Sequence, residues 1–174
     1  MQRDSQRSKV YRAEERAFGS AMNTHENGTR ELSLEEMQAL VDRWRSSKVL
    51  RRHYPKAQTR IRVTDGRGKR HACCHVGRIE HRLEMPRFAR TKPALLHEFA
   101  HALAPRRVQH GWEFAEVYLY VVRVFMSKSA EERLKAEFSA GKVRHRPKRT
   151  RQISEADRQR ARERMQALNA ARRG

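Results

Sequence analysis

Two histidines and a glutamate lie within five consecutive positions near the middle of the chain. Residues 97–101 read His-Glu-Phe-Ala-His, which is an H-E-x-x-H pattern. On a helix, residues four positions apart lie on the same face, one turn from each other. His97 and His101 could therefore bind one zinc ion, and Glu98 could act as a base on a zinc-bound water. The pattern predicts a metal, a base and a hydrolytic reaction together.

A catalytic zinc ion needs a third protein ligand and an open position for water. His110 follows His101 after a spacer of eight residues that contains a proline, so a turn between two helices could return it to the site. Glu113 is a rival third ligand, but His110 is the simpler choice because it stands at the start of the next helix. The alternative interpretation is that His97 and His101 lie on a solvated helix face and bind no metal.

Local signals predict the helix that must carry the motif. Thr91 is a suitable N-cap, Pro93 is tolerated in the first turn, and Pro105 marks the end of a helix over residues 92–104. Residues 112–125 are rich in β-branched and aromatic side chains, but their apolar spacing and length favour a buried helix. Further helices are expected over residues 5–18, from a capping box at Ser33 to before His53, and from a cap at Ser129 to about Ala140.

Three short segments before the motif have the composition of β-strands. They are residues 60–63, which alternate between polar and apolar side chains, residues 71–76, and residues 78–85, which end at Pro86. They predict a small antiparallel sheet with one solvated face, packed on helices that include the motif helix. The expected fold class is therefore α+β.

The positive charge is spread unevenly over the 174 residues. Lys and Arg number 40 against 20 Asp and Glu, which gives a net charge of +20. Residues 1–32, an N-terminal helix and loop, hold 6 Lys and Arg against 5 Asp and Glu. Residues 33–141, the expected catalytic domain, hold 22 basic against 12 acidic residues. Residues 142–174, a basic and partly helical tail, hold 12 basic against 3 acidic residues.

A field of this sign favours nucleic acid as a partner. The alternative interpretation is a solvated basic surface. The tail residues expected to contact nucleic acid are Lys142, Arg144, Arg146, Lys148, Arg149 and Arg151.

Several functional classes are not expected from the composition. No run of about 18 apolar residues could cross a membrane. The first residues have no apolar core of a secretory signal. The only two cysteines, Cys73 and Cys74, are adjacent and unsuited to a framework disulfide, so a reducing cytoplasm is expected.

A second group of metal-binding side chains lies on the second expected strand. His71, Cys73 and His75 would share one face of that strand, which makes a metal cluster geometrically feasible. No fourth ligand is near in the sequence, and the favoured interpretation is that these are structural residues.

Three segments of the chain resemble a family of zinc metallohydrolases from actinobacteria and their phages. The segments are RDSQRSKVYRAEERAF, LEMPRFARTKPALLHEFAHAL and HGWEFAEVYLYVV, and the resemblance covers most of residues 3–126. HEFAHAL followed by HGWEF is also similar to the SprT-like metallopeptidases, whose pattern is H-E-x-x-H, a spacer, then H-G-x-x-F. The resemblance implies a zincin-like α+β fold, zinc on His97, His101 and His110, and Glu98 as the base. A SprT-type zinc ribbon, which needs four Cys or His ligands downstream, is absent from the sequence.

The expected function is zinc-dependent hydrolysis of peptide bonds near nucleic acid. The strand at residues 78–85 would bind an extended substrate by β-addition. Two alternatives are a zinc-stabilised nucleic-acid-binding module without turnover, and hydrolysis of a non-peptide amide. Candidates for stabilising the oxyanion are Tyr118, Tyr120, Arg87 and Arg90, each of which could instead be a core or surface residue.

Overall fold

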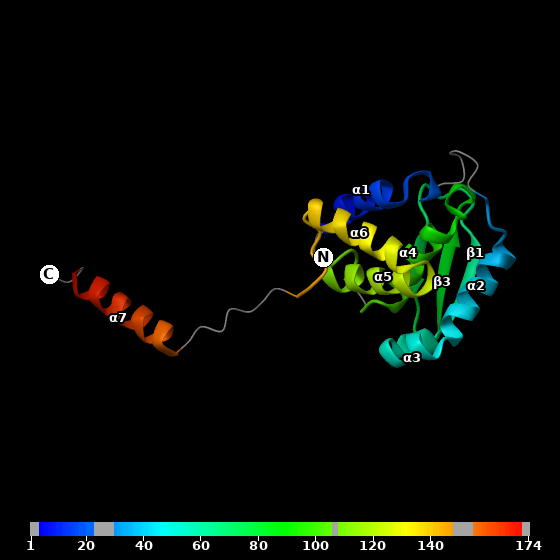
Figure 1. The fold of residues 1–174 in the computed structure, drawn as a ribbon. Helices are drawn as coiled ribbons and strands as arrows, with labels where there is room; N and C mark the ends of the chain where they lie inside the picture. The colour runs from blue at the N-terminus through cyan, green and yellow to red at the C-terminus, as the bar shows by residue number, and fades with distance from the viewer. Residues whose placement is uncertain (1–3, 23–29, 106–107, 148–154, 172–174) are drawn as a thin grey trace.

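The computed structural model describes residues 4–22, 30–105, 108–147 and 155–171. Within these ranges, seven α-helices and a three-stranded sheet form an α+β fold (Figure 1). None of the described helices is long and apolar enough to cross a membrane. The elements are α1 Arg7–Phe18, α2 Leu34–Ser46, α3 Lys48–His53, β1 Arg60–Asp65, β2 Cys73–Val76, β3 Glu80–Met85, α4 Lys92–Leu103, α5 Trp112–Phe125, α6 Lys128–Ala140 and α7 Glu155–Ala171.

The sheet is mixed, and its strand order is β1-β3-β2. The three predicted strands are present, but the prediction of an antiparallel sheet is wrong for one pair. β1 and β3 are parallel, while β2 and β3 are antiparallel. After β1 the chain crosses to the far edge to form β2 and then turns back to place β3 in the middle. The turn between β2 and β3 is tight and requires glycine at position 77, because a Cβ there would lie 2.1 Å from the Glu80 carbonyl oxygen.

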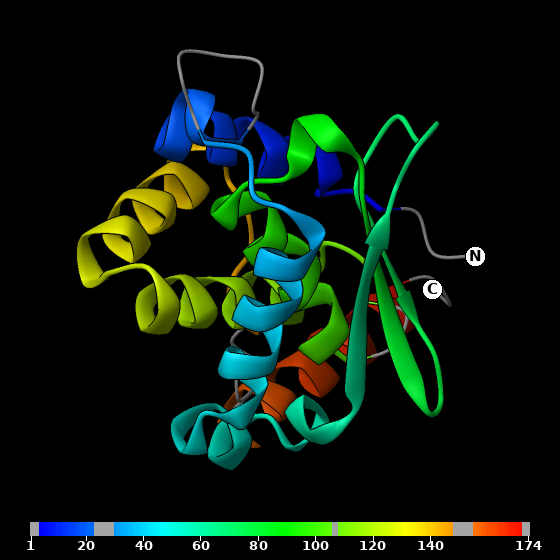
Figure 2. The same cartoon turned by 90° about the vertical axis from the view of Figure 1, so that its right-hand side faces the viewer.

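One face of the sheet is buried and the other is solvated, as the alternation predicted. Ile61 and Leu83 point into the core, while Arg62 and Arg82 are exposed on the outer face. α2 and α4 cover the inner face (Figure 2), and α5 packs on α4. This layering places the motif helix α4 between the sheet and α5, so both of its sides are buried.

Most predicted helices form where expected, with two differences at their ends. The helix that begins at the Ser33 capping box ends at Ser46, because Ser47 is extended and caps a separate helix, α3. α6 begins two residues earlier than predicted. Its cap is Ser127, whose hydroxyl accepts a hydrogen bond from the Ala130 amide, and not Ser129.

The two ends of the chain relate differently to the core. α1 packs against α6, and its Val10 and Ala13 are buried in the same core as the sheet and α4. The first residues of the predicted tail also belong to the compact part, since Val143 is buried there. α7 lies apart from the other elements (Figure 1).

Candidate metal centre

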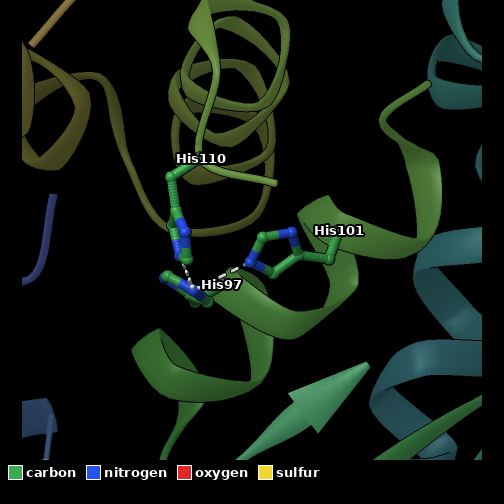
Figure 3. Close-up of side chains that lie close together, drawn as sticks. All are labelled: His97, His101 and His110. Carbon is green, nitrogen blue, oxygen red and sulfur yellow. Dashed lines mark hydrogen bonds between the residues drawn. The ribbon is translucent and has the colours of Figure 1, made fainter. Parts of the chain in front are cut away.

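The imidazoles of His97, His101 and His110 converge on one point (Figure 3). The Nε2 atom of His97 lies 3.2 Å from Nε2 of His101 and 3.3 Å from Nε2 of His110. A tetrahedral zinc ion with Zn–N bonds of about 2.0–2.1 Å needs ligand nitrogens about 3.3 Å apart. The predicted convergence is thus present, with a spacing that suits zinc. Among the described residues, this group contains His110 and not the rival Glu113.

Local geometry explains how His110 returns to the motif helix. The hydroxyl of Thr91 accepts a hydrogen bond from the Ala94 amide and fixes the start of α4, as predicted. Before α5 the chain turns sharply: Gln109 has a positive φ of 46°, and the Gly111 amide donates to the Val108 carbonyl at 2.7 Å. A Cβ on Gly111 would lie only 2.9 Å from that carbonyl oxygen, so this close turn favours glycine.

Phe114 forms an aromatic wall behind the three histidines. Its ring stacks on His101 with centroids 4.1 Å apart, and it lies 5.0 Å from the rings of both His97 and His110. The side chain of Phe114 is fully buried. The H-G-x-x-F sequence thus supplies the third imidazole, the glycine of the turn and the ring that packs against the imidazoles.

Two carboxylates from the start of the chain hold the outer nitrogens of two histidines. Nδ1 of His110 donates to Asp4 Oδ2 at 2.6 Å, and Nδ1 of His97 donates to Glu14 Oε1 in a short contact. Carboxylates only accept, so both imidazoles carry their proton on Nδ1. Carboxylates in this position fix the tautomer and ring orientation of metal-binding histidines. Gln6 adds a hydrogen bond of 2.8 Å from its side-chain amide to the His110 carbonyl.

When both imidazoles are neutral, these contacts leave the Nε2 atoms of His97 and His110 unprotonated, with their lone pairs facing each other. Two lone pairs 3.3 Å apart in a buried site repel unless a proton or a metal ion lies between them. Three neutral imidazole nitrogens are a donor set typical of catalytic zinc. The residues present therefore fit a zinc ion.

The electrostatics favour neutral imidazoles at two of the three positions. Burial, and then the charge of His97, lower the pKa of both His101 and His110, while Asp4 partly opposes the shift at His110. Burial also disfavours the charged form of His97, but Glu14 and Glu98 outweigh it and raise the pKa of His97. A proton on His97 would thus compete with a cation for the site, and binding should strengthen as the pH rises.

Glu98 is buried beside the histidines, with 5% of its surface exposed. Burial raises the pKa of Glu98 to about 7; the charge of His97 opposes the shift and that of Glu14 adds to it. A carboxyl group with a pKa near neutral is suited to exchanging protons with a substrate or with water.

Two cavities, of about 400 and 360 Å³, lie beside the site and share Tyr11, Ala72 and Glu98 in their walls. One cavity also reaches His97, and the other reaches His101 and His110. The Tyr11 ring contacts His97 and His110 at centroid distances of 5.5 and 5.3 Å. Glu98 thus lies at the wall between two spaces that a long substrate could enter.

The prediction that the strand at residues 78–85 binds substrate by β-addition is wrong. β3, which corresponds to residues 78–85, is the central strand and pairs on both sides, so it has no free edge for β-addition. The edge strand near the site is β2, which contacts α4 and contributes Cys73, Cys74 and Val76 to the second cavity.

None of the four oxyanion candidates lines the two cavities. Tyr118 is fully buried in the core behind His97, and Tyr120 packs against Tyr54. Arg87 forms an ion pair with Glu31, and Arg90 pairs with Asp65 and Glu31.

Sequence reasoning missed the contribution of the N-terminal segment to the site. Asp4, Arg7, Tyr11 and Glu14 all contact or line it. The one sequence signal for these residues was the resemblance proposed for the opening segment, which did not assign them a role in the site. No local pattern connects them with histidines about a hundred positions away.

The described residues among the predicted nucleic-acid contacts do not line the two cavities beside the histidines. Lys142, Arg144 and Arg146 are exposed, while the predicted contacts at Lys148, Arg149 and Arg151 fall outside the described residues. The backbone of Arg144 is held by hydrogen bonds to the side chain of Gln6, so these cations follow directly on the compact part.

No family model, curated protein or solved structure matches the chain.

Proposed function

We propose that this protein is a zinc-dependent metallopeptidase with a zincin-like fold. His97, His101 and His110 hold the zinc ion, and Glu98 is the catalytic base. The observation that carries the proposal is the convergence of the three Nε2 atoms, of which those of His97 and His110 lie 3.3 Å apart while carboxylates occupy both Nδ1 atoms. A metal ion between the three nitrogens would bind all of them, and the adjacent buried carboxylate supports a catalytic rather than a purely structural ion.

The chain's own residues have distinct parts in the reaction. Bound zinc supplies Lewis acidity and lowers the pKa of a coordinated water to about 7. Glu98 accepts a proton from the attacking water and returns it to the leaving amine. Asp4 and Glu14 keep the imidazoles in the tautomer that binds metal. Tyr11 and Arg7, which line the cavity beside Glu98, are placed to stabilise the charge that develops on the scissile carbonyl.

The substrate is a polypeptide in extended conformation. β2 is an edge strand beside the second cavity, and a free strand edge binds extended peptides through backbone hydrogen bonds. The two cavities on either side of Glu98 provide room for side chains before and after the scissile bond.

Substitution of the base tests the mechanism. Zinc-loaded wild-type protein should cleave an unfolded protein substrate, and Glu98→Gln should lose at least about a hundredfold in kcat/KM while binding zinc normally. Glu113→Gln is the matched control, because Glu113 lies outside the histidine group, and it should retain full activity. Equal activity of wild type and Glu98→Gln would refute the assigned mechanism.

The exposed cations of Lys142, Arg144 and Arg146 favour action near nucleic acid. They also support the second candidate, a zinc-stabilised nucleic-acid-binding module without turnover. The two candidates differ in one result. Zinc binding and salt-sensitive DNA binding, without cleavage of any unfolded substrate by the wild type, would favour the module.

A further inference from the structure

We infer that Cys73, His75 and Glu84 form a second metal site, which takes a zinc-like divalent ion on the outer face of the sheet. This site shares no ligand with the histidine centre. It does not depend on the proposed peptidase activity.

Three different donor atoms form a nearly equilateral triangle at this position. Cys73 Sγ lies 3.3 Å from His75 Nε2 and 3.3 Å from Glu84 Oε2, and His75 Nε2 lies 3.2 Å from the same carboxylate oxygen. Tetrahedral zinc with Zn–S of about 2.3 Å and Zn–N or Zn–O of about 2.0–2.2 Å needs donor separations of about 3.3–3.6 Å. A small outward movement of the thiolate would open the triangle to that size.

The pairing of β2 with β3 builds the triangle. Cys73 lies directly opposite Glu84, and His75 lies two residues along β2 on the same face. The Glu84 side chain is 12% exposed, and Arg82 binds its other oxygen, Oε1, at 3.1 Å. Oε2 is thereby directed at the cysteine and the histidine. The sequence analysis considered His71 as a third ligand and favoured structural roles for these residues, whereas the third member of the group in the structure is Glu84 from the neighbouring strand.

The charges of the donors suit a dication. On metal binding the Cys73 thiol, which donates to Glu84 in the structure, would release its proton to solvent. The resulting thiolate and the carboxylate neutralise Zn²⁺, and an imidazole adds a neutral ligand. Lys69 lies 3.5 Å from Glu84 Oε2 and opposes a cation, but its side chain is 54% exposed and can turn toward solvent. Three ligands leave a fourth position for water.

The position of the site gives it a structural consequence. Cys73 faces outward, whereas its neighbour Cys74 packs against the core. An ion held by Cys73, His75 and Glu84 would tie the edge strand β2 to the central strand β3. Because β2 also lines the cavity beside the histidine centre, the ion would stiffen one wall of that cavity.

Cobalt substitution distinguishes the two sites, because only the second contains a thiolate. The full-length protein titrated with Co²⁺ should bind two equivalents and develop a thiolate-to-cobalt charge-transfer band. Cys73→Ser should bind one equivalent and lack the band. Cys74→Ser is the matched control on the adjacent residue and should keep both the band and the two equivalents.

Two further variants separate failure of the inference from failure of the proposed function. His101→Ala should lose the other equivalent and keep the charge-transfer band, whereas Glu84→Gln should weaken cobalt binding at the thiolate site by about tenfold or more. Wild-type protein that folds and shows no band, or a band that persists in Cys73→Ser, would overturn the second site. A band lost only in Cys74→Ser would overturn it as well.

Discussion

The two ends of this chain are both polar, yet one is built into the candidate metal centre and the other is not. Helix α1 buries Val10 and Ala13 in the core, and its segment places Asp4 and Glu14 on two of the three histidines. Helix α7 exposes its large apolar residues Met165 and Leu168, and it lies apart from the other elements (Figure 1).

The two helices differ in how many apolar side chains they can bury and in the hydrogen bonds that they form with the core. α1 has a narrow apolar stripe and a buried acid that finds an imidazole partner, so its polar composition does not keep it out of the fold. A helix with few buried apolar residues gains little from packing and depends on a partner for its role. The N-terminal segment thus completes the candidate metal centre, whereas the described part of the tail helix contributes no residue to it.

The largest difference in stability should appear when one carboxylate is placed in α1 and, separately, one in α7. Val10→Asp puts an unpaired carboxylate into the core and should lower the free energy of unfolding by about 3 kcal/mol or more. Met165→Asp, at a side chain that is 58% exposed, should change it by less than about 0.5 kcal/mol. Urea unfolding of both variants measures the difference. Equal stabilities would show that α1 is not part of the core.

The carboxylates of the N-terminal segment should control metal affinity. Asp4→Asn and Glu14→Gln replace a charged acceptor with a neutral amide that holds the imidazole tautomer less strongly, so each should weaken zinc binding by about 10- to 100-fold. Competition with a chromophoric chelator gives the dissociation constant. Glu15→Gln, on the same helix but exposed, is the control and should bind zinc as the wild type does. Unchanged affinity in Asp4→Asn and Glu14→Gln would remove the N-terminal segment from the site.

The proposed peptidase activity and the proposed nucleic-acid binding should depend differently on pH. Burial raises the pKa of Glu98 to about 7, and a bound dication nearby would lower it again, so the acidic limb of kcat/KM should lie at or below pH 7. Glu98 acts as a base only when ionised, so peptidase activity should fall about tenfold per pH unit below that pKa. Nucleic-acid binding by the basic residues 142, 144 and 146 should stay nearly constant from pH 5 to 8, because it does not depend on Glu98. A parallel loss of both would contradict separate sites.

The smallest effect is expected in the tail. Replacing Lys142, Arg144 and Arg146 by Ala should reduce the salt dependence of DNA binding by up to about three units of slope, about one for each phosphate contact. Zinc content and peptidase activity should not change, because these exposed side chains neither belong to the histidine group nor line the two cavities. Binding isotherms at several salt concentrations give the slope. An unaltered slope would exclude these residues from the nucleic-acid contact.

Much of the centre could be predicted because its signals are local. The Thr91 cap and the spacing of His97, Glu98 and His101 depend on a few neighbouring residues, and the structure has each feature in place. The preference for His110 over Glu113 was also a local argument about a turn between two helices. The strand positions followed from alternation, but their order did not. Alternation is the same for parallel and antiparallel partners, so it could not place β3 in the middle.

What the sequence by itself determined is the helix with His97, Glu98 and His101, the third histidine of the candidate site at position 110, and the excess of positive charge. These follow from spacing, capping and composition. Only the tertiary structure decided that Asp4 meets His110 across 106 positions, that Glu14 meets His97 across 83, and that Glu84 completes a triangle with Cys73 and His75. The physical reason is that helix caps and periodicity act over one or two turns. The contacts of Asp4, Glu14 and Glu84 depend instead on how separate elements bury their apolar faces together.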